Sequence, residues 1–481
     1  MGLSNKDFFI NGEWVPSESS RTLPVTNPAT GEVVGEVPLG TAADADRALR
    51  AAQAAFDGWR ARPMAERAAL QHTAAAGLRE RISDFARALT MELGRPLTGS
   101  HKEIERSAEL LDYFAEEGLR LRGEIPMLNL PDGRVFVVKE PVGVVVAIAP
   151  FNYPINLLCF KLGPALITGC TVVAKPAADT PLTTLMLAEV FHAAGFPPGV
   201  FNVVTGRGSE IGQALVEHPI PRKIGFTGGN AVGKRIAAAA AQTNKRLTLE
   251  LGGQCPAIVS ADADLEVALP ALLRQTFANS GQFCYRVNRM YVQQGIYAAF
   301  CERFAQAARG LTVGNGLNPE CQVGPLANKD TFRKTSKHVQ DALQKGARLE
   351  AGGERLTGPG FDGGYFWPPT VLVDADHSMQ IMTEETFGPV VGLMPVEMLD
   401  EAITYANDSP YGLAAFVFSK DLANALRAAE RCEAGSVWVN NIHATYNQAP
   451  FGGFKESGLG REKSRYGLEE YLELKTIYLS F

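Results

Sequence analysis

One cysteine in this sequence lies where its thiol could do chemistry. Cys284 is in the run NSGQFCYRVNR, directly after an apolar helical pattern over Leu265–Phe277. Free cysteines are among the most buried residue types, so a packed core thiol is the plainer interpretation. The small polar turn at 279–282 favours a second interpretation, because it puts the thiol on a loop at a helix exit. A thiolate there could act as a nucleophile.

Glu250 and Asn152 are the candidates for a base and an oxyanion donor. Glu250 ends the alternating run RLTLELGG, and the two glycines after it allow a tight turn beside a cleft. A carboxylate there could activate water if burial raised its pKa, although a solvated strand carboxylate also fits the pattern. Asn152 lies in APFNYP, between an apolar strand and a helix. Its amide could cap that helix or donate to a developing oxyanion.

A glycine-rich turn in FTGGNAVGK indicates a site for a pyrophosphate. Gly228, Gly229 and Gly233 follow an apolar strand and open a helix. Helix N-termini bind anions, although a helix entry with a packing glycine would leave the same pattern. The turn is not a Walker A loop, because Arg235 stands where that loop has Ser or Thr.

Alternating short strands and helices over residues 142–251 must position these turns. Strands are predicted at Val142–Ala149, Thr171–Lys175, Val200–Thr205, Lys223–Phe226 and Arg246–Leu251, and helices at 155–168, Thr183–Ala194, Ser209–Glu217 and Ala231–Gln242. This alternation predicts a parallel sheet with helices on both faces, whose ligands bind beyond the carboxyl ends of the strands. Asn152, Lys175 and Thr227–Gly233 follow three of those ends.

The rest of the chain adds helices before this region and a second α/β stretch after it. Residues 41–119 are predicted to be helical, with Thr41 and Asp44 forming a capping box. The second stretch, at about 255–440, includes strands such as Arg289–Gln293 and Ala414–Phe418. The tail Tyr471–Ser480 is predicted to be a strand. It needs a partner edge, and a second subunit could supply one.

Composition limits the class of protein. The 481 residues exceed what one core usually serves, so several domains are expected. The net charge of −6 and the lack of a basic stripe argue against a nucleic-acid partner. The longest apolar stretch, Val142–Phe151, is far shorter than the ~20 residues of a membrane span, and the start has no secretory pattern. Seven cysteines without CxxC and seven dispersed histidines predict a reduced, cytoplasmic chain without a metal site.

In their joint order these stretches resemble the aldehyde dehydrogenase superfamily, of the NAD(P)-dependent hydrolytic kind. The similarity runs from FFINGEW through PFNYP, VVAKP, FTGGNAVGK, LELGGQCP, GQFC, EETFGPV, NDSPYGL and PFGGFKESGLGRE to the tail. It implies an α/β fold with a Rossmann-like cofactor domain (1–120 and 142–252) and a catalytic α/β domain (253–453). A small β element (121–141 and 468–481) would build a homo-oligomer, either a dimer or a tetramer.

The resemblance also implies roles for individual residues. Cys284 would be the nucleophile, Glu250 the general base and Asn152 the oxyanion donor. The implied cofactor residues are Lys175 and Ala178 at the adenosine ribose, Gly208, Thr227, Gly228, Gly229 and Gly233 near the phosphates, and Glu385 and Phe387 at the nicotinamide end. The implied reaction forms a thiohemiacetal, releases a hydride to NAD or NADP, and hydrolyses the resulting thioester.

Two departures from the family pattern bear on the cofactor. Many members have a Glu that binds the adenosine ribose hydroxyls, and Ala178 replaces it here. A Glu would repel a 2′-phosphate, so its loss predicts that NADP is used at least as well as NAD. Asp179 could restore a negative field if it turned inward. Gly229 takes the place of a Ser that is frequent in the pyrophosphate loop.

Other departures bear on the substrate. Members that oxidise succinate semialdehyde carry arginines where this chain has Phe160 and Ala278, and non-phosphorylating glyceraldehyde-3-phosphate dehydrogenases carry one where it has Phe283. We therefore expect a small or medium uncharged aldehyde. Arg286 and His443 leave open a semialdehyde or a lactaldehyde-like hydroxyaldehyde. The predicted pocket residues are Phe151, Tyr153, Phe283, Tyr285, Arg286 and His443.

Two more remote functions remain as alternatives. A CoA-acylating dehydrogenase needs no water-activating base, so Glu250 counts against it. A non-catalytic protein on the same fold would tolerate loss of the nucleophile, so the joint presence of Cys284, Glu250 and Asn152 counts against that function.

Overall fold

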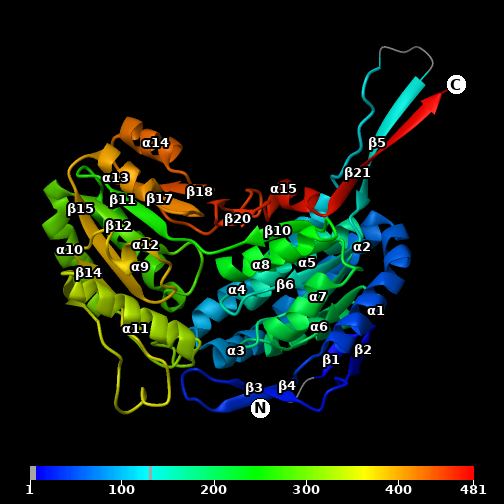
Figure 1. Cartoon of the computed structure of the whole chain (residues 1–481), viewed down its shortest axis with the longest axis horizontal. Coiled ribbons are helices and arrows are strands. Elements are labelled where there is room, and N and C mark those ends of the chain that lie inside the picture. Colours follow the sequence, from blue (N-terminus) through cyan, green and yellow to red (C-terminus); the bar gives the residue numbers. More distant parts are fainter. Residues whose placement is uncertain (1–6, 129–132, 481) are drawn as a thin grey trace.

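The computed structural model describes residues 7–128 and 133–480, which form two α/β lobes and a projecting β ribbon (Figure 1). The first lobe contains the N-terminal half of the chain, and the second is built from segments coloured from green through yellow to orange in Figure 1. The chain crosses between the lobes after strand β10 and returns with strand β20. None of the helices in the described ranges is both long and apolar enough to cross a membrane.

The sheet of the first lobe has the order β2-β1-β8-β7-β6-β9-β10-β20. Its strands are β1 (Phe8–Ile10), β2 (Glu13–Val15), β6 (Val144–Ile148), β7 (Thr171–Lys175), β8 (Phe201–Val203), β9 (Lys223–Thr227), β10 (Arg246–Glu250) and β20 (Gly458–Leu459). Strands β8, β7, β6, β9 and β10 pair in parallel. The five parallel strands are those predicted from the sequence, with ends that differ by at most two residues.

Strand β6 is the point at which the order of this sheet reverses. From β6 the chain moves outward to β7 and β8, and then returns to place β9 on the other side of β6. A crevice forms beyond the carboxyl ends of the strands at such a point, and ligands of open α/β sheets bind there. Asn152 follows β6 and the glycine-rich turn follows β9, so the fold brings two of the candidate segments to this crevice.

The helices of the first lobe agree with the predicted ones, with one exception. They are α1 (Ala42–Ala61), α2 (Met64–Glu80), α3 (Ile82–Leu93), α4 (Leu97–Gly118), α5 (Pro154–Thr168), α6 (Leu182–Ala193), α7 (Gln213–Glu217) and α8 (Asn230–Ala241). The capping box of α1 is present, since Thr41 accepts from the backbone N–H of Asp44, and the Asp44 carboxylate accepts from the Thr41 N–H. The exception is the predicted helix Ser209–Glu217, which is a π-helical turn (Gly208–Gly212) followed by the short α7.

The second lobe has a seven-stranded sheet with the order β13-β14-β15-β12-β11-β17-β18. Its strands are β11 (Cys255–Val259), β12 (Val287–Gln293), β13 (Arg348–Ala351), β14 (Thr370–Val373), β15 (Val390–Val396), β17 (Ala414–Phe418) and β18 (Ser436–Val439). The helices that follow β10 are α9 (Leu265–Phe277), α10 (Gln294–Arg309), α11 (Lys329–Gln344), α12 (Gln380–Thr383), α13 (Leu399–Asn407), α14 (Leu422–Arg431) and α15 (Ser464–Glu469). All strand pairs except β13–β14 are parallel.

Three small ribbons complete the fold: β3 (Thr22–Thr26) with β4 (Val33–Pro38), β16 (Tyr411–Gly412) with β19 (Phe454–Lys455), and β5 (Gly133–Pro141) with β21 (Leu472–Ser480). The last ribbon projects from the first lobe (Figure 1), and its register runs from Leu472 opposite Pro141 to Ser480 opposite Gly133. The C-terminal strand thus joins the 121–141 segment, as the resemblance implies. In the described part of that segment the only other pairing is the bridge between Glu124 and Val137.

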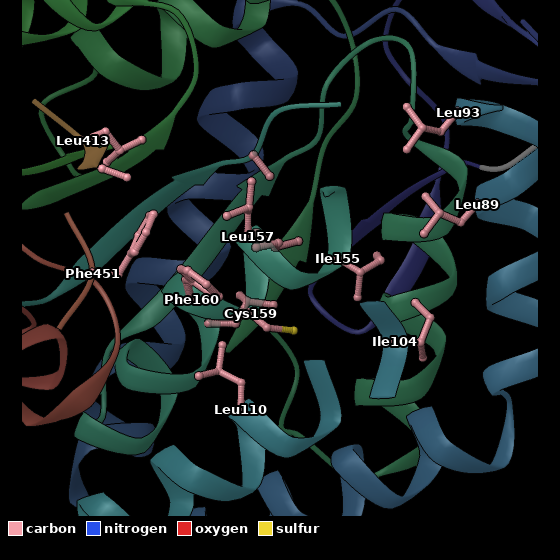
Figure 2. Close-up of a cluster of buried hydrophobic side chains, with 14 of the residues drawn as sticks. Leu89, Leu93, Ile104, Leu110, Ile155, Leu157, Cys159, Phe160, Leu413 and Phe451 are labelled. Atoms are coloured by element: carbon pink, nitrogen blue, oxygen red, sulfur yellow. The ribbon is translucent and has the colours of Figure 1, made fainter. Parts of the chain in front are cut away.

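Helix α5 is buried along almost its whole length and packs against α4. Figure 2 shows Ile155 close to Ile104 of α4, and Phe160 on the side of α5 that faces Phe451. Apolar residues on several sides of α5 explain this position, because a helix without a polar face must be surrounded by protein. Its N-terminus is therefore also enclosed, and the free N–H groups there need partners.

Two carboxylates from neighbouring helices supply these partners. The Glu103 carboxylate of α4 accepts hydrogen bonds from the backbone N–H groups of Ile155 (2.9 Å) and Asn156 (3.0 Å), at the start of α5. Its other oxygen pairs with Arg95. Glu92 of α3 acts in the same way on α6, accepting from the N–H groups of Leu182 and Thr183. Neither helix has a side-chain cap of its own, so these carboxylates determine where both helices begin.

We predict that Glu103→Ala lowers the free energy of unfolding by ~3–5 kcal/mol, because it leaves the buried Arg95 guanidinium without its counter-ion. Urea denaturation followed by circular dichroism would measure the loss. Glu105→Ala, at an exposed position of the same helix, is the matched control and should change the unfolding free energy by less than ~0.5 kcal/mol. Equal effects of the two substitutions would contradict the capping role.

Candidate active site

The loop that carries Cys284 begins with a left-handed turn. Asn279, Ser280 and Gly281 have φ values of 49°, 56° and 71°, which reverse the chain after α9. A Cβ atom at Gly281 would lie 2.3 Å from the carbonyl oxygen of Gly388, so only glycine fits this close approach. The turn directs Cys284 into a cavity that also reaches Asn152.

An amide network holds Asn152 beside this loop. Its Nδ2 donates to the carbonyl oxygen of Gln282 (3.0 Å), and Nδ2 of Asn279 donates to the carbonyl oxygen of Asn152 (3.1 Å). One of the two amide hydrogens of Asn152 is used in this way, and the other is left for an oxygen bound in the cavity. The structure thus brings Asn152 and Cys284 together, as their predicted roles require.

Cys284 differs from the other cysteines in its exposure. It is half-buried at the cavity wall, whereas the six others are buried. Burial of the thiol, and then the neighbouring Glu250 carboxylate, raise the pKa of Cys284 well above its usual value. The resting group is therefore a thiol, and it must lose its proton before it can act as a nucleophile.

Glu250 does not line this cavity. It is buried at the end of β10, and neither carboxylate oxygen has a hydrogen-bond partner among the described residues. Burial, followed by the nearby Glu462, raises the pKa of Glu250 well above its usual value. A Cβ atom at Gly452 would lie 2.9 Å from Oε1, so the glycine-rich loop makes room for this carboxylate. A raised pKa and free oxygens are the properties expected of a general base.

A buried ion pair adjoins Glu250. The Lys161 ammonium of α5 binds Oε1 of Glu462 (2.7 Å) and Oγ1 of Thr227 (2.7 Å). Sequence inspection did not single out Lys161 or Glu462. The two residues lie about 300 positions apart along the chain, so only the structure reveals that they form a pair.

The predicted phosphate-site glycines have two different environments. Cβ atoms at Gly228 and Gly233 would lie 2.4 Å from Phe226 and 2.5 Å from Leu251, so these two glycines permit close packing. Gly208 and Gly229 border open space instead. Gly229 is the N-cap of α8 and provides no side chain to its free N–H groups. An anion could approach this helix terminus without obstruction.

Lys175 is the last residue of β7, and Ala178 and Asp179 follow it shortly after the end of this strand. The buried Lys175 ammonium donates to the carbonyl oxygen of Pro176 (2.8 Å), and burial lowers the pKa of this lysine to about 8. Asp179 accepts a hydrogen bond from Asn328 Nδ2 (2.9 Å), and burial raises the pKa of the Asp179 carboxyl. Asp179 is thus engaged by the second lobe, while the half-buried Ala178 adds no charge.

The predicted nicotinamide-end residues come from the second lobe. Oε1 of Glu385 accepts from the backbone N–H of Gly253 (3.0 Å), and a Cβ atom at Gly252 would lie 2.8 Å from Oε2. Phe387 has φ 60° and contacts Phe151 edge to face, with ring centroids 5.8 Å apart. Lys175 offers a cation, the open N-terminus of α8 offers an anion site, and Glu385 offers a carboxylate for ribose hydroxyls. These groups fit a nicotinamide dinucleotide.

The cavity around Cys284 has a volume of about 1620 Å³ and contains four of the predicted substrate residues: Tyr153, Phe283, Tyr285 and His443. The Tyr285 ring stacks on Trp438 at 5.8 Å and meets Phe451 at 5.6 Å, which fixes its orientation. Phe151 lies outside this cavity, on the Phe387 side.

The prediction for Arg286 was wrong. Its side chain is buried away from the cavity and donates to the carbonyl oxygens of Val287 (3.2 Å) and Val390 (2.7 Å). Strand β12 begins at the next residue, so the side chain points into the second lobe and joins two strands. The cations that do line the cavity were missed: they are Arg95, Lys102, Arg106, Arg120, Arg274, Lys463 and Arg465. The charged run SHKEIER (100–106) was the available sequence signal for Lys102 and Arg106 on α4.

Residues 14–477 match the aldehyde dehydrogenase family, and the chain belongs to it. It is 44% identical to 3-sulfolactaldehyde dehydrogenase of Pseudomonas putida, over 99% of this chain and 97% of that protein. It is 41% identical to the NADP(+) succinate-semialdehyde dehydrogenase of Escherichia coli strain K12, over 98% and 97%. A solved lactaldehyde dehydrogenase superposes with a TM-score of 0.97 at 36% identity, over 99% of this chain and 100% of that one.

We predict that alkylation of Cys284 by iodoacetamide accelerates as the pH rises, because the raised pKa keeps the sulfur protonated at neutral pH. Glu250→Gln removes a neighbouring negative charge, so the midpoint of this profile should move to lower pH. Mass spectrometry of the Cys284 peptide measures the rate, and the buried Cys255 serves as the internal control. An unchanged or higher midpoint in Glu250→Gln would contradict the electrostatic coupling.

Proposed function

We propose that this protein oxidises a short aldehyde bearing an acidic group to the corresponding acid, with NADP or NAD as hydride acceptor. The observation that carries the proposal is the cavity that Cys284 and Asn152 line together with the cations Arg106, Lys463 and Arg465. Two of the compared relatives are named for 3-sulfolactaldehyde and succinate semialdehyde, which carry an acidic group, whereas the third is named for the uncharged lactaldehyde. The aromatic side chains of the same cavity favour the second candidate, a small or medium uncharged aldehyde.

In the proposed mechanism the Cys284 thiol releases its proton to solvent in the cavity, and the resulting thiolate attacks the aldehyde carbon and forms a thiohemiacetal. Nδ2 of Asn152 and the backbone N–H of Cys284 donate to the oxyanion, and the loss of one such donor costs ~2.7–4 kcal/mol of barrier. Bound NAD(P) supplies the acceptor for the hydride that leaves when the oxyanion collapses to a thioester. Glu250 then takes a proton from water, and the attack of this water on the thioester releases the acid and the thiol.

The proposal predicts that kcat/KM is at least 10-fold higher for succinate semialdehyde than for butanal. Both have four carbons, so the comparison isolates the carboxylate. Formation of reduced nicotinamide at 340 nm measures turnover. Cys284→Ala should abolish it, and Glu250→Gln should retain a single burst of reduced nicotinamide followed by slow turnover. Equal rates for the two aldehydes would favour the uncharged substrate instead.

For the cofactor we propose that NADP is used at least as well as NAD. Ala178 removes the carboxylate that would repel a 2′-phosphate, Asp179 is held by Asn328, and the Lys175 ammonium remains as a point charge for the phosphate. Ala178→Glu should therefore lower kcat/KM for NADP at least 10-fold while changing that for NAD less than threefold. An NAD preference of ~100-fold in the unmodified protein, about 2.7 kcal/mol, would refute the proposal.

We also propose that the protein is a cytoplasmic homo-oligomer, a dimer or a tetramer. Its domains would be a cofactor domain (1–120 and 142–252), a catalytic domain (253–453) and an oligomerisation element (121–141 and 468–481). The support is the β5–β21 ribbon, on which Leu474 and Tyr478 are 70% and 77% exposed. Large apolar side chains on a projecting ribbon favour contact with another subunit.

A further inference from the structure

Lys463 is a buried cation in the wall of the active-site cavity. The side chain belongs to the loop between β20 and α15, and the residue is only 4% exposed. Its ammonium donates to the carbonyl oxygen (3.1 Å) and the hydroxyl oxygen (2.8 Å) of Thr445. No carboxylate of the described chain lies within the 4.0 Å of an ion pair. Buried lysines are rarely left without a counter-ion, so this one needs an explanation.

The electrostatic surroundings favour an anion at this position. Burial, and then the nearby Arg106, lower the pKa of Lys463 to about 7, and the carboxylates of Glu462 and Glu109 only partly offset these effects. Arg106 lies on α4, lines the same cavity and forms no ion pair within the described ranges. A bound anion would stabilise both positive charges.

Lys463 also lies next to Phe160, one of the positions at which this chain departs from the family pattern. Its ammonium lies 5.0 Å from the centre of the Phe160 ring. Phe160 occupies the place of an arginine in members that oxidise succinate semialdehyde, and its ring cannot bind an acidic group. The cation next to this place comes instead from a segment about 300 residues later in the chain. Phe160, Lys463 and Cys284 line one cavity, so the cation and the nucleophile face the same substrate space.

We propose that Lys463 binds the acidic end of the aldehyde substrate, with Arg106 as a second cation nearby. This inference rests on the proposed function and names the residue that would confer it. A carboxylate and a sulfonate share the chemistry that such a site recognises, a compact anion with several acceptor oxygens.

The test compares Lys463→Met with Lys463→Arg on succinate semialdehyde, 3-sulfolactaldehyde and butanal. Lys463→Met should lower kcat/KM for one or both acidic aldehydes by 10- to 100-fold, mainly through KM, and should change that for butanal less than threefold. Lys463→Arg should retain most of the acidic preference, because it keeps the charge. Lys102→Met removes the same charge from an exposed position on the cavity rim and should change every ratio less than threefold. The acidic aldehyde that loses more identifies the preferred anion.

A structural role would give a different result. If Lys463 only held the loop through Thr445, Lys463→Met would impair all three aldehydes alike, and the proposal would be overturned. A wild-type protein that prefers acidic aldehydes, and a Lys463→Met variant that keeps this preference, would also overturn it while leaving the proposed function intact. A wild-type protein without the preference would overturn both. Protection of Cys284 against alkylation by succinate, lost in Lys463→Met, provides a readout that does not depend on turnover.

Discussion

The enclosed N-terminus of α5 is the constraint on which the geometry of the site depends. Asn152 lies in the turn just before this helix, so its position is determined by where the helix begins. Glu103 fixes that point by accepting two N–H groups, and Arg95 holds Glu103 in place. The Arg95 guanidinium also lies 4.5 Å from the centre of the Tyr153 ring, so the same ion pair supports the aromatic wall of the cavity.

Around this constraint the protein treats its buried charges in two ways. Arg95 and Lys161 have carboxylate partners, and such pairs fix the relative positions of distant segments. Glu250 and Lys463 lack charged partners in direct contact, and burial moves the pKa of each toward its neutral form. An unpaired buried charge is unfavourable unless a ligand or a reaction step uses it. Glu250 and Lys463 lie close to the cavity of Cys284, and Lys175, which is also buried with only a carbonyl partner, lies at the proposed dinucleotide site, so a reaction or a ligand would use each of these groups.

Local patterns predicted much of this structure, and distant contacts account for what they missed. The strand Thr171–Lys175 and the helix Leu265–Phe277 have the predicted ends, because apolar runs with clear breaks depend on neighbouring residues. The location of Cys284 on a loop could be predicted for the same reason. The burial of Arg286 could not, since it depends on the Val390 carbonyl of another strand. Lys463 was missed because its neighbours Thr445 and Phe160 come from separate parts of the chain.

The close approach of Gly281 to Gly388 has a consequence for how this protein can evolve. The first glycine belongs to the turn that carries Cys284, and the second follows Phe387, which contacts Phe151. A larger side chain at Gly281 would displace both segments at once. Changes in nucleophile placement and in dinucleotide affinity are therefore not independent traits here. Sequence variants that improve one should show epistasis with those that improve the other. The backbone segments around Gly281 and Gly388 should therefore either change together during evolution or both remain unchanged.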